Sequence, residues 1–236
     1  TGGTYNNATL SYEVISSVVL TLNSNIITAA SKTFLINPGA TLILGDGTLA
    51  SAATSGGLIT NSGSLYFNGN IITGSGGFTN TSAAATFLFI DHSGGIAAST
   101  TANGNIQVTG TRTFGVAANY IYNGTTPQVT GSGLPTANIT GTLTIDNPTS
   151  VSLSSSHTLS NSSIPLYLNQ GLLILGNNNL TLSNANASIG GNTTSASNMI
   201  VTNGTGQLVK AFSAGTPSFT FPIGDNTGDI EYTPFA

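Results

Sequence analysis

The sequence predicts an all-β protein, built as a right-handed parallel β-helix (a solenoid) with a C-terminal β-hairpin cap. Apolar and polar residues alternate in short runs, as they do in half-buried strands. The runs recur at a nearly constant spacing, which is typical of a solenoid. Gly or Asn interrupts almost every window, so no segment keeps the apolar period of an amphipathic helix. A β-sandwich, which also contains many short strands, is the alternative architecture.

The predicted strands centre on triplets that carry apolar residues at their first and third positions. They occupy residues 20–22, 42–44, 65–67, 87–89, 106–108, 120–122, 143–145, 166–168, 199–201 and 219–221. First members at 20, 42, 65 and 87 are separated by 22, 23 and 22 residues, and those at 120, 143 and 166 by 23. Further strands are expected at 34–36, 58–59, 151–153 and 172–175. We therefore expect coils of about 22 residues, each packing its inward side chains on the next coil.

Three segments follow from this pattern. Residues 1–19 contain the alternating run "YEVISSVVL" and are predicted to form an N-terminal strand, a possible assembly arm that pairs with a neighbouring subunit's edge. Residues 20–195 are predicted to form the β-helix. Residues 196–236 read as strands joined by Gly-containing turns, which predicts a β-rich cap or a junction to a following domain. The start at Thr1 and the abrupt end are expected for a processed chain or a fragment.

Composition excludes several classes of partner. Charged residues make up 4% of the chain, against about 25% in ordinary globular proteins. With three Lys and Arg in total, the chain cannot neutralise many phosphates, so nucleic acids and anionic membrane surfaces are not expected partners. No apolar run approaches the roughly 20 residues of a membrane span. The absence of Cys excludes disulfides and thiolate metal sites.

Five motifs of the second half occur in a characteristic order. They are "NYIYNGTTPQVTGSGLP" (119–135), "LTIDNPTSVSLSSSHTLS" (143–160), "GLLILGNNNLTLSNANASIGG" (171–191), "SASNMIVTNGTGQLVKAF" (195–212) and "SFTFPIGDNTGDIEYTPF" (218–235). As a set they resemble a recurring segment of very large Bacteroidetes surface proteins exported by type IX secretion. The resemblance implies a secreted β-helical repeat or junction segment of an adhesin-like or filamentous protein. It implies no catalytic residues.

The segment "GDNTGDIE" concentrates three of the seven acidic residues of the chain. Asp225, Asp229 and Glu231 offer the hard oxygen ligands that calcium takes, although the spacing lacks the alternate-position pattern of a calcium loop. The other interpretation, which we favour, is a polar turn in which Asp225 bonds its own backbone. No other metal or cofactor is expected.

The sequence gives less support to a catalytic site than to a structural role. Polysaccharide-cleaving enzymes occur among β-helices and need two facing carboxyl groups. Asp46, Asp91 and Asp146 each follow a strand-like run, and two of them would lie about 10 Å apart if they shared a face. The histidines, His92 and His157, are expected in loops or at corners, and no GxSxG motif occurs.

The expected function is therefore structural and non-enzymatic. We expect an extracellular stalk or filament subunit, or an adhesin segment, on a bacterial cell surface. Its expected partners are other copies of the chain or other domains of a larger chain, and glycans or surfaces in the adhesin case. A β-helical carbohydrate-binding or polysaccharide-degrading protein is the alternative.

Overall fold

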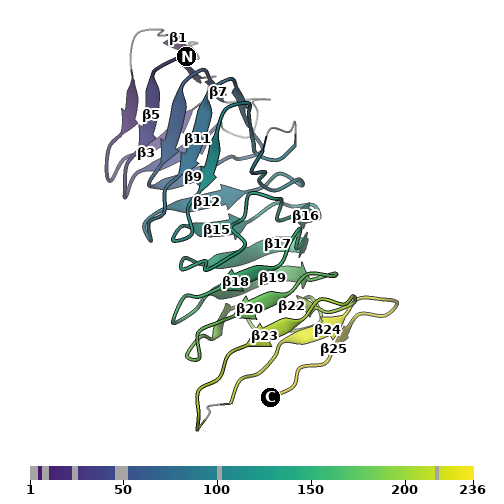
Figure 1. Ribbon diagram of the computed structural model, residues 1–236. Helices are drawn as coiled ribbons and strands as arrows, with labels where there is room; N and C mark the ends of the chain where they lie inside the picture. Colours follow the sequence, from purple (N-terminus) through teal and green to yellow (C-terminus); the bar gives the residue numbers. More distant parts are fainter. Residues whose placement is uncertain (1–4, 7–10, 23–25, 46–52, 100–102, 216–217) are drawn as a thin grey trace.

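The structure, a computed structural model, describes residues 5–6, 11–22, 26–45, 53–99, 103–215 and 218–236 (Figure 1). These residues form strands and turns with no helix, and the strands stack as a β-solenoid of about 8 turns. The predicted parallel β-helix is confirmed. The β-sandwich alternative is wrong, because the strands of a sandwich pair antiparallel, whereas here every strand pair except one is parallel within the described residues.

The N-terminal half has a three-sided coil, with one strand from each coil on each side. The first side contains β1 (Tyr5–Asn6), β4 (Ile26–Thr28), β7 (Ala53–Ser55), β10 (Ile72–Gly74) and β13 (Ile106–Val108). The second contains β2 (Tyr12–Val14), β5 (Thr33–Ile36), β8 (Leu58–Asn61), β11 (Gly77–Asn80) and β14 (Arg112–Phe114).

The third side is a sheet that runs along the whole molecule, which we call the long sheet (Figure 1). Its strands are β3 (Val19–Leu22), β6 (Thr41–Leu44), β9 (Ser64–Tyr66), β12 (Phe87–Ile90), β15 (Asn119–Tyr122), β17 (Leu143–Ser152), β19 (Leu166–Ile174), β22 (Asn198–Val201), β24 (Ile223–Asp225) and β25 (Glu231–Tyr232). Two short strands pair beside it: β16 (Gln128–Val129) and β21 (Ile189–Gly191). A separate sheet of the C-terminal half contains β18 (His157–Leu159), β20 (Leu180–Leu182) and β23 (Leu208–Lys210).

Strand pairing in the long sheet fixes the coil length. Leu20 pairs with Leu42, and Leu42 with Leu65, which gives steps of 22 and 23 residues. Leu65 pairs with Leu88, a step of 23, and Leu88 with Tyr120, a step of 32. The predicted period is therefore correct for most coils. The irregular middle of the sequence is one longer coil, in which the extra residues follow β12.

One strand faces the other way from its prediction. In the triplet 87–89, Phe87 and Phe89 were expected to point inward, but Leu88 and Ile90 are fully buried and Phe87 is 37% exposed. All four residues of "FLFI" are apolar, so alternation by itself does not distinguish its two faces. The pairing of Leu88 with the buried Leu65 fixes which face is inward, because a one-residue shift in register would move every side chain to the other face.

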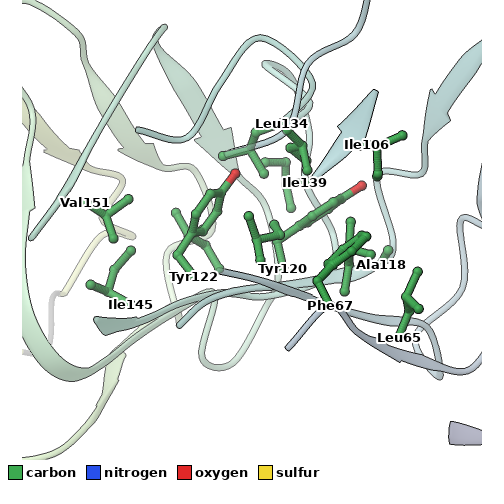
Figure 2. Close-up of a cluster of buried hydrophobic side chains, with 14 of the residues drawn as sticks. Leu65, Phe67, Ile106, Ala118, Tyr120, Tyr122, Leu134, Ile139, Ile145 and Val151 are labelled. Atoms are coloured by element: carbon green, nitrogen blue, oxygen red, sulfur yellow. The ribbon is translucent and has the colours of Figure 1, made fainter. Parts of the chain in front are cut away.

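The residue types in the core change at β15, which follows the longer coil. Most inward positions of the long sheet carry aliphatic side chains, whereas β15 carries Tyr120 and Tyr122, which are both fully buried (Figure 2). Their hydroxyl groups donate to the carbonyls of Gly115 (2.8 Å) and Thr130 (2.7 Å). Burial raises the pKa of both phenols. The larger tyrosine side chains occupy the junction between the three-sided coils and the differently shaped C-terminal coils.

A column of buried amide side chains follows the long sheet at one corner, and we call it the amide column. Its members are Asn70, Asn105, Gln128 and Asn147, none of them more than 2% exposed. Asn70 Nδ2 donates to the carbonyl of Leu44 in the preceding coil (2.8 Å). The amides thus hydrogen-bond polar groups buried at this corner, where a polar group without a partner is costly.

Gln128 connects three coils. Its Nε2 donates to the carbonyls of Ile90 and His92, both at 3.0 Å, in the preceding coil. Its Oε1 accepts from the backbone N–H of Gly124 (2.9 Å) in its own coil and from Asn147 Nδ2 (2.8 Å) in the next. The side chain therefore satisfies four polar groups at once.

The backbones of neighbouring coils approach closely at some corners. A Cβ on Gly76 would lie 1.8 Å from the carbonyl oxygen of Gly57, and a Cβ on Gly57 would lie 2.0 Å from that of Lys32. Both contacts are with backbone, which cannot move aside. Glycine at this corner is therefore required by contact between coils.

The two ends of the chain extend the solenoid in different ways. Tyr12 and Val14, which fall in the predicted arm, pair with Phe34 and Ile36 of β5 and so belong to the first described coils. Beyond residue 195, β22, β23 and β24 still pair in parallel with earlier strands. The predicted hairpin is present at β24–β25, where Gly224 pairs antiparallel with Tyr232.

His157 differs from its prediction as a loop or corner residue. It begins β18 and is 1% exposed. Its Nδ1 lies 2.8 Å from the carbonyl oxygen of Pro135, a bond that requires a proton on Nδ1. Burial lowers the pKa of this imidazole from its usual value of 6.5. The ring is therefore a neutral core side chain.

Replacement of Gln128 tests the amide column. Gln128→Leu removes four hydrogen bonds and leaves the buried backbone N–H of Gly124 without its partner, so we expect a loss of about 3 kcal/mol in the free energy of unfolding. Gln170→Leu is the matched control, because Gln170 is exposed and donates one hydrogen bond, to the carbonyl of Asp146. Its expected loss is below about 1 kcal/mol. Urea unfolding followed by circular dichroism measures both, and equal losses would contradict the role given to Gln128.

Acidification tests the environment of His157. Its folded-state pKa is lowered, so its contribution to stability is fully present above the unfolded pKa of 6.5 and decreases as the pH falls below that value. We expect wild type to lose more stability than His157→Gln between about pH 7.5 and about pH 5.5. The two proteins share every other titratable group, so the comparison isolates position 157. Parallel pH profiles of the melting temperature would disprove the assignment.

Candidate functional site

The acidic residues near the C-terminus lie in the terminal hairpin. Asp225 ends β24 and pairs with Glu231 of β25, while Asp229 lies in the turn between these strands. Asp225 Oδ1 accepts a hydrogen bond from the backbone N–H of Thr227 (2.8 Å), and this bond lowers the pKa of the carboxyl group. Gly228 has a φ of 79°. These are the features of a polar turn stabilised by its own Asp side chain.

The same carboxylates lie on exposed residues. Asp225, Asp229 and Glu231 are all exposed. In the part of the chain that the structure describes, no group of three or more His, Cys, Asp or Glu side chains is placed to hold a metal ion. The calcium interpretation of this cluster stays a prediction.

Two of the three isolated aspartates share a corner. Asp91 directly follows β12, and Asp146 lies within β17. The residues before them, Ile90 and Ile145, both pair with Tyr122. They therefore lie two coils apart, a separation of about 10 Å. Asp91 Oδ2 accepts from the backbone N–H of Gly69 (2.6 Å) and Oδ1 from Asn105 Nδ2 (2.7 Å). Asp46 lies outside the described residues.

The histidines do not form a catalytic triad. His92 Nδ1 accepts a hydrogen bond from the backbone N–H of Gly94 (2.9 Å), within its own turn. His157 Nε2 lies 3.3 Å from Ser155 Oγ, a pair that sequence reasoning missed. The other ring nitrogen of His157 faces the Pro135 carbonyl, which cannot stabilise an imidazolium as a carboxylate does.

A concavity of about 630 Å³ opens on the outer face of the long sheet, and we call it the corner groove. It lies where β6, β9 and the turns after β9, β12 and β15 meet. Its lining residues are Ile43, Tyr66, Phe67, Asn68, Gly69, Asp91, Asn123, Gly124 and Thr125. The volume is within the range of about 300–1,000 Å³ that is usual for small-ligand sites.

An outward column of apolar side chains runs past the corner groove, and two of its members, Ile43 and Tyr66, line the groove. Ile43 pairs with Tyr66, Tyr66 with Phe89, and Phe89 with Ile121, on four successive coils. The rings of Tyr66 and Phe89 stack with centroids 3.7 Å apart and planes 14° apart. Partial burial raises the pKa of the Tyr66 phenol, so its hydroxyl stays protonated at neutral pH.

The rim of the groove is polar, and a backbone turn fixes part of it in place. Asn68 and Gly69 both have positive φ, 50° and 79°, and so form a sharp turn after β9. This turn directs the N–H of Gly69 to the carboxylate of Asp91. Asn123 is half-buried, and its Oδ1 has no hydrogen-bond partner among the described residues.

Sequence reasoning missed the corner groove. The signal was Tyr66, an aromatic residue at the outward position of the triplet 65–67, where a polar residue is expected. Its stacking partner was hidden, because Phe89 was expected to point inward. The polar residues of the rim come from three coils, which only the pairing of strands brings together.

Substitution of Asp225 distinguishes a turn from a calcium site. If the residue acts through its bond to the Thr227 N–H, Asp225→Ala lowers the melting temperature and Asp225→Asn, which keeps an acceptor oxygen, changes it less. Differential scanning calorimetry should then give the same wild-type melting temperature in calcium chloride and in EDTA. A rise in calcium that Asp225→Asn removes would instead establish the ion site.

Comparisons with known proteins identify no relative of this chain. No protein-family model matches it, and no significant match is found among curated proteins or solved structures. Within the described residues, no helix is long and apolar enough to cross a membrane.

Proposed function

We propose that this chain is a non-enzymatic structural segment of an extracellular protein on a bacterial cell surface, acting as a stalk or filament subunit or as an adhesin segment. The observation that carries the proposal is the long sheet, whose parallel strand pairs continue from β3 to β24. A continuous ladder of main-chain hydrogen bonds along one axis makes a stiff rod. Stiffness along an axis is the property that a stalk needs.

The side chains support the same role. Charged residues make up 4% of the chain, so its surface relies on uncharged Ser, Thr, Asn and Gly. Such surfaces can approach one another end to end or side by side without strong charge repulsion. The resemblance of the second half to type IX-exported surface proteins of Bacteroidetes points in the same direction.

Apolar side chains at both ends favour contacts along the axis. Val19 is 66% exposed and Ile15 59% exposed in the first described coils. Phe235 is 57% exposed and Ile230 52% exposed beside the terminal hairpin. We propose that another copy of the chain, or a further domain of a larger chain, covers these ends.

The alternative is an enzyme that degrades polysaccharides. It is favoured by one observation, the placement of Asp91 and Asp146 at the same corner, two coils apart. Against it, both oxygens of Asp91 already accept hydrogen bonds from the protein. A carboxylate held in this way is suited to a structural role or to ligand binding.

The proposal predicts a protein that is displayed on cells and does not cleave polysaccharides. An antibody raised against the purified chain should label intact cells of the source organism, and protease treatment of those cells should remove the label. The purified chain should release no reducing ends from a panel of neutral and acidic polysaccharides.

Labelling only after permeabilisation would contradict the extracellular assignment. Release of reducing ends that is abolished in Asp146→Asn would replace the structural proposal with the enzymatic one. Asp146 is half-buried and its carboxylate makes no hydrogen bond within the described residues, which makes this substitution the cleaner test.

A further inference from the structure

The corner groove combines an aromatic surface with hydrogen-bonding groups. Phe89 covers one face of the Tyr66 ring at 3.7 Å. Because Ile43 and Phe89 pair with Tyr66 from opposite sides, the other ring face is directed to the coil of Ile43, and both Ile43 and Tyr66 line the groove. Stacking on Phe89 fixes the orientation of the Tyr66 ring before any ligand arrives, so little conformational entropy is lost on binding.

Four polar side chains surround this surface. Asn68 Nδ2 bonds the carbonyl of Gly45, which leaves its Oδ1 to accept a ligand hydroxyl. Asp91 is held in place by Gly69 and Asn105, and a carboxylate oxygen can accept more than one hydrogen bond. Thr125 is exposed and adds a hydroxyl. Asn123 has an amide oxygen with no partner in the described part of the chain, so its side chain can reorient without breaking a bond to that oxygen.

Charge limits the class of ligand. Among the described residues that line the groove there is no cation, and Asp91 contributes a negative charge. Arg112 is directed away from the solvent: it is 8% exposed and donates to the carbonyls of Val108 and Ala97. Anionic ligands are therefore disfavoured. Ligands rich in neutral hydroxyl groups, which donate to Asp and Asn oxygens, are favoured.

We propose that the corner groove binds a neutral sugar unit of a glycan. The apolar face of the sugar lies against Tyr66 and Ile43, and its hydroxyl groups bond Asn68, Asp91, Asn123 and Thr125. A pyranose ring offers both surfaces, because its C–H groups form an apolar face and its hydroxyl groups project around the edge. The site does not depend on the proposed stalk role, since it is complete within one chain.

Binding of defined oligosaccharides tests the proposal. The probes are cellotetraose, mannotetraose and maltotetraose as neutral chains, and tetragalacturonate as an acidic one. Saturation-transfer NMR and isothermal titration calorimetry with the full chain should detect binding of at least one neutral probe and none of the acidic probe. No binding of any neutral probe, or stronger binding of tetragalacturonate, would overturn the proposal.

Three substitutions locate the binding. Tyr66→Ala should weaken the Kd at least about tenfold, because it removes the aromatic surface. Tyr167→Ala is the matched control: Tyr167 occupies the same outward column beyond Thr144 and does not line the groove. Its Kd should equal that of wild type. Asn123→Ala should weaken binding about fivefold, and the side-chain oxygen that it removes has no hydrogen-bond partner among the described residues.

The last substitution keeps the test decisive if Tyr66→Ala unfolds the chain. Asn123→Ala is expected to keep the wild-type melting temperature, so a change in Kd then reports contact with the sugar. Wild-type affinity in both Tyr66→Ala and Asn123→Ala would place any bound sugar elsewhere on the molecule and overturn the proposal.

Discussion

The structure depends on hydrogen bonds between buried amide side chains and the backbone of neighbouring coils. A solenoid of this kind must turn its chain at every corner, and each turn leaves N–H and C=O groups outside the ladders of the sheets. The amide column satisfies these groups from inside. Gln128 is its central member, because it bonds carbonyls of the preceding coil and an amide of the next. Stacking is therefore enforced by side chains as well as by strands.

The same column positions the corner groove. Asn105 binds the carboxylate of Asp91 on one side and accepts the backbone N–H groups of Asp91 and His92 on the other. The Asp91 side chain is thereby fixed at the rim. Stacking of Tyr66 on Phe89 fixes the floor in the same way, through a contact between adjacent coils. The groove thus forms only when the coils stack, because its floor and its rim each combine residues of more than one coil.

Sequence alone predicted the class of fold and most of its repeat, since the alternation at 42–44 and 65–67 matches the burial of these strands. It failed where both faces of a strand are apolar, as at Phe87–Ile90. It also failed for His157, because a polar residue among serines reads as exposed, yet the Pro135 carbonyl offers it a buried partner. The turn at Asp225 could be predicted from the sequence, since an Asp side chain accepts a hydrogen bond from a backbone N–H two residues further on. The corner groove was not, because Tyr66 and Asn123 are 57 residues apart and meet only through the pairing of β9, β12 and β15.

The long coil between Leu88 and Tyr120 has a consequence for how such a molecule can evolve. Its additional residues enter at the corner after β12, and parallel pairing resumes unchanged at β15. The buried Ile96 within this segment pairs its backbone with Thr130 and Gly133 of the following turn. Corner length can therefore vary without disturbing the stacked core. Because this corner also carries Asp91, insertions and deletions here would reshape the rim of the groove and change which ligand it selects, while the inherited scaffold stays the same.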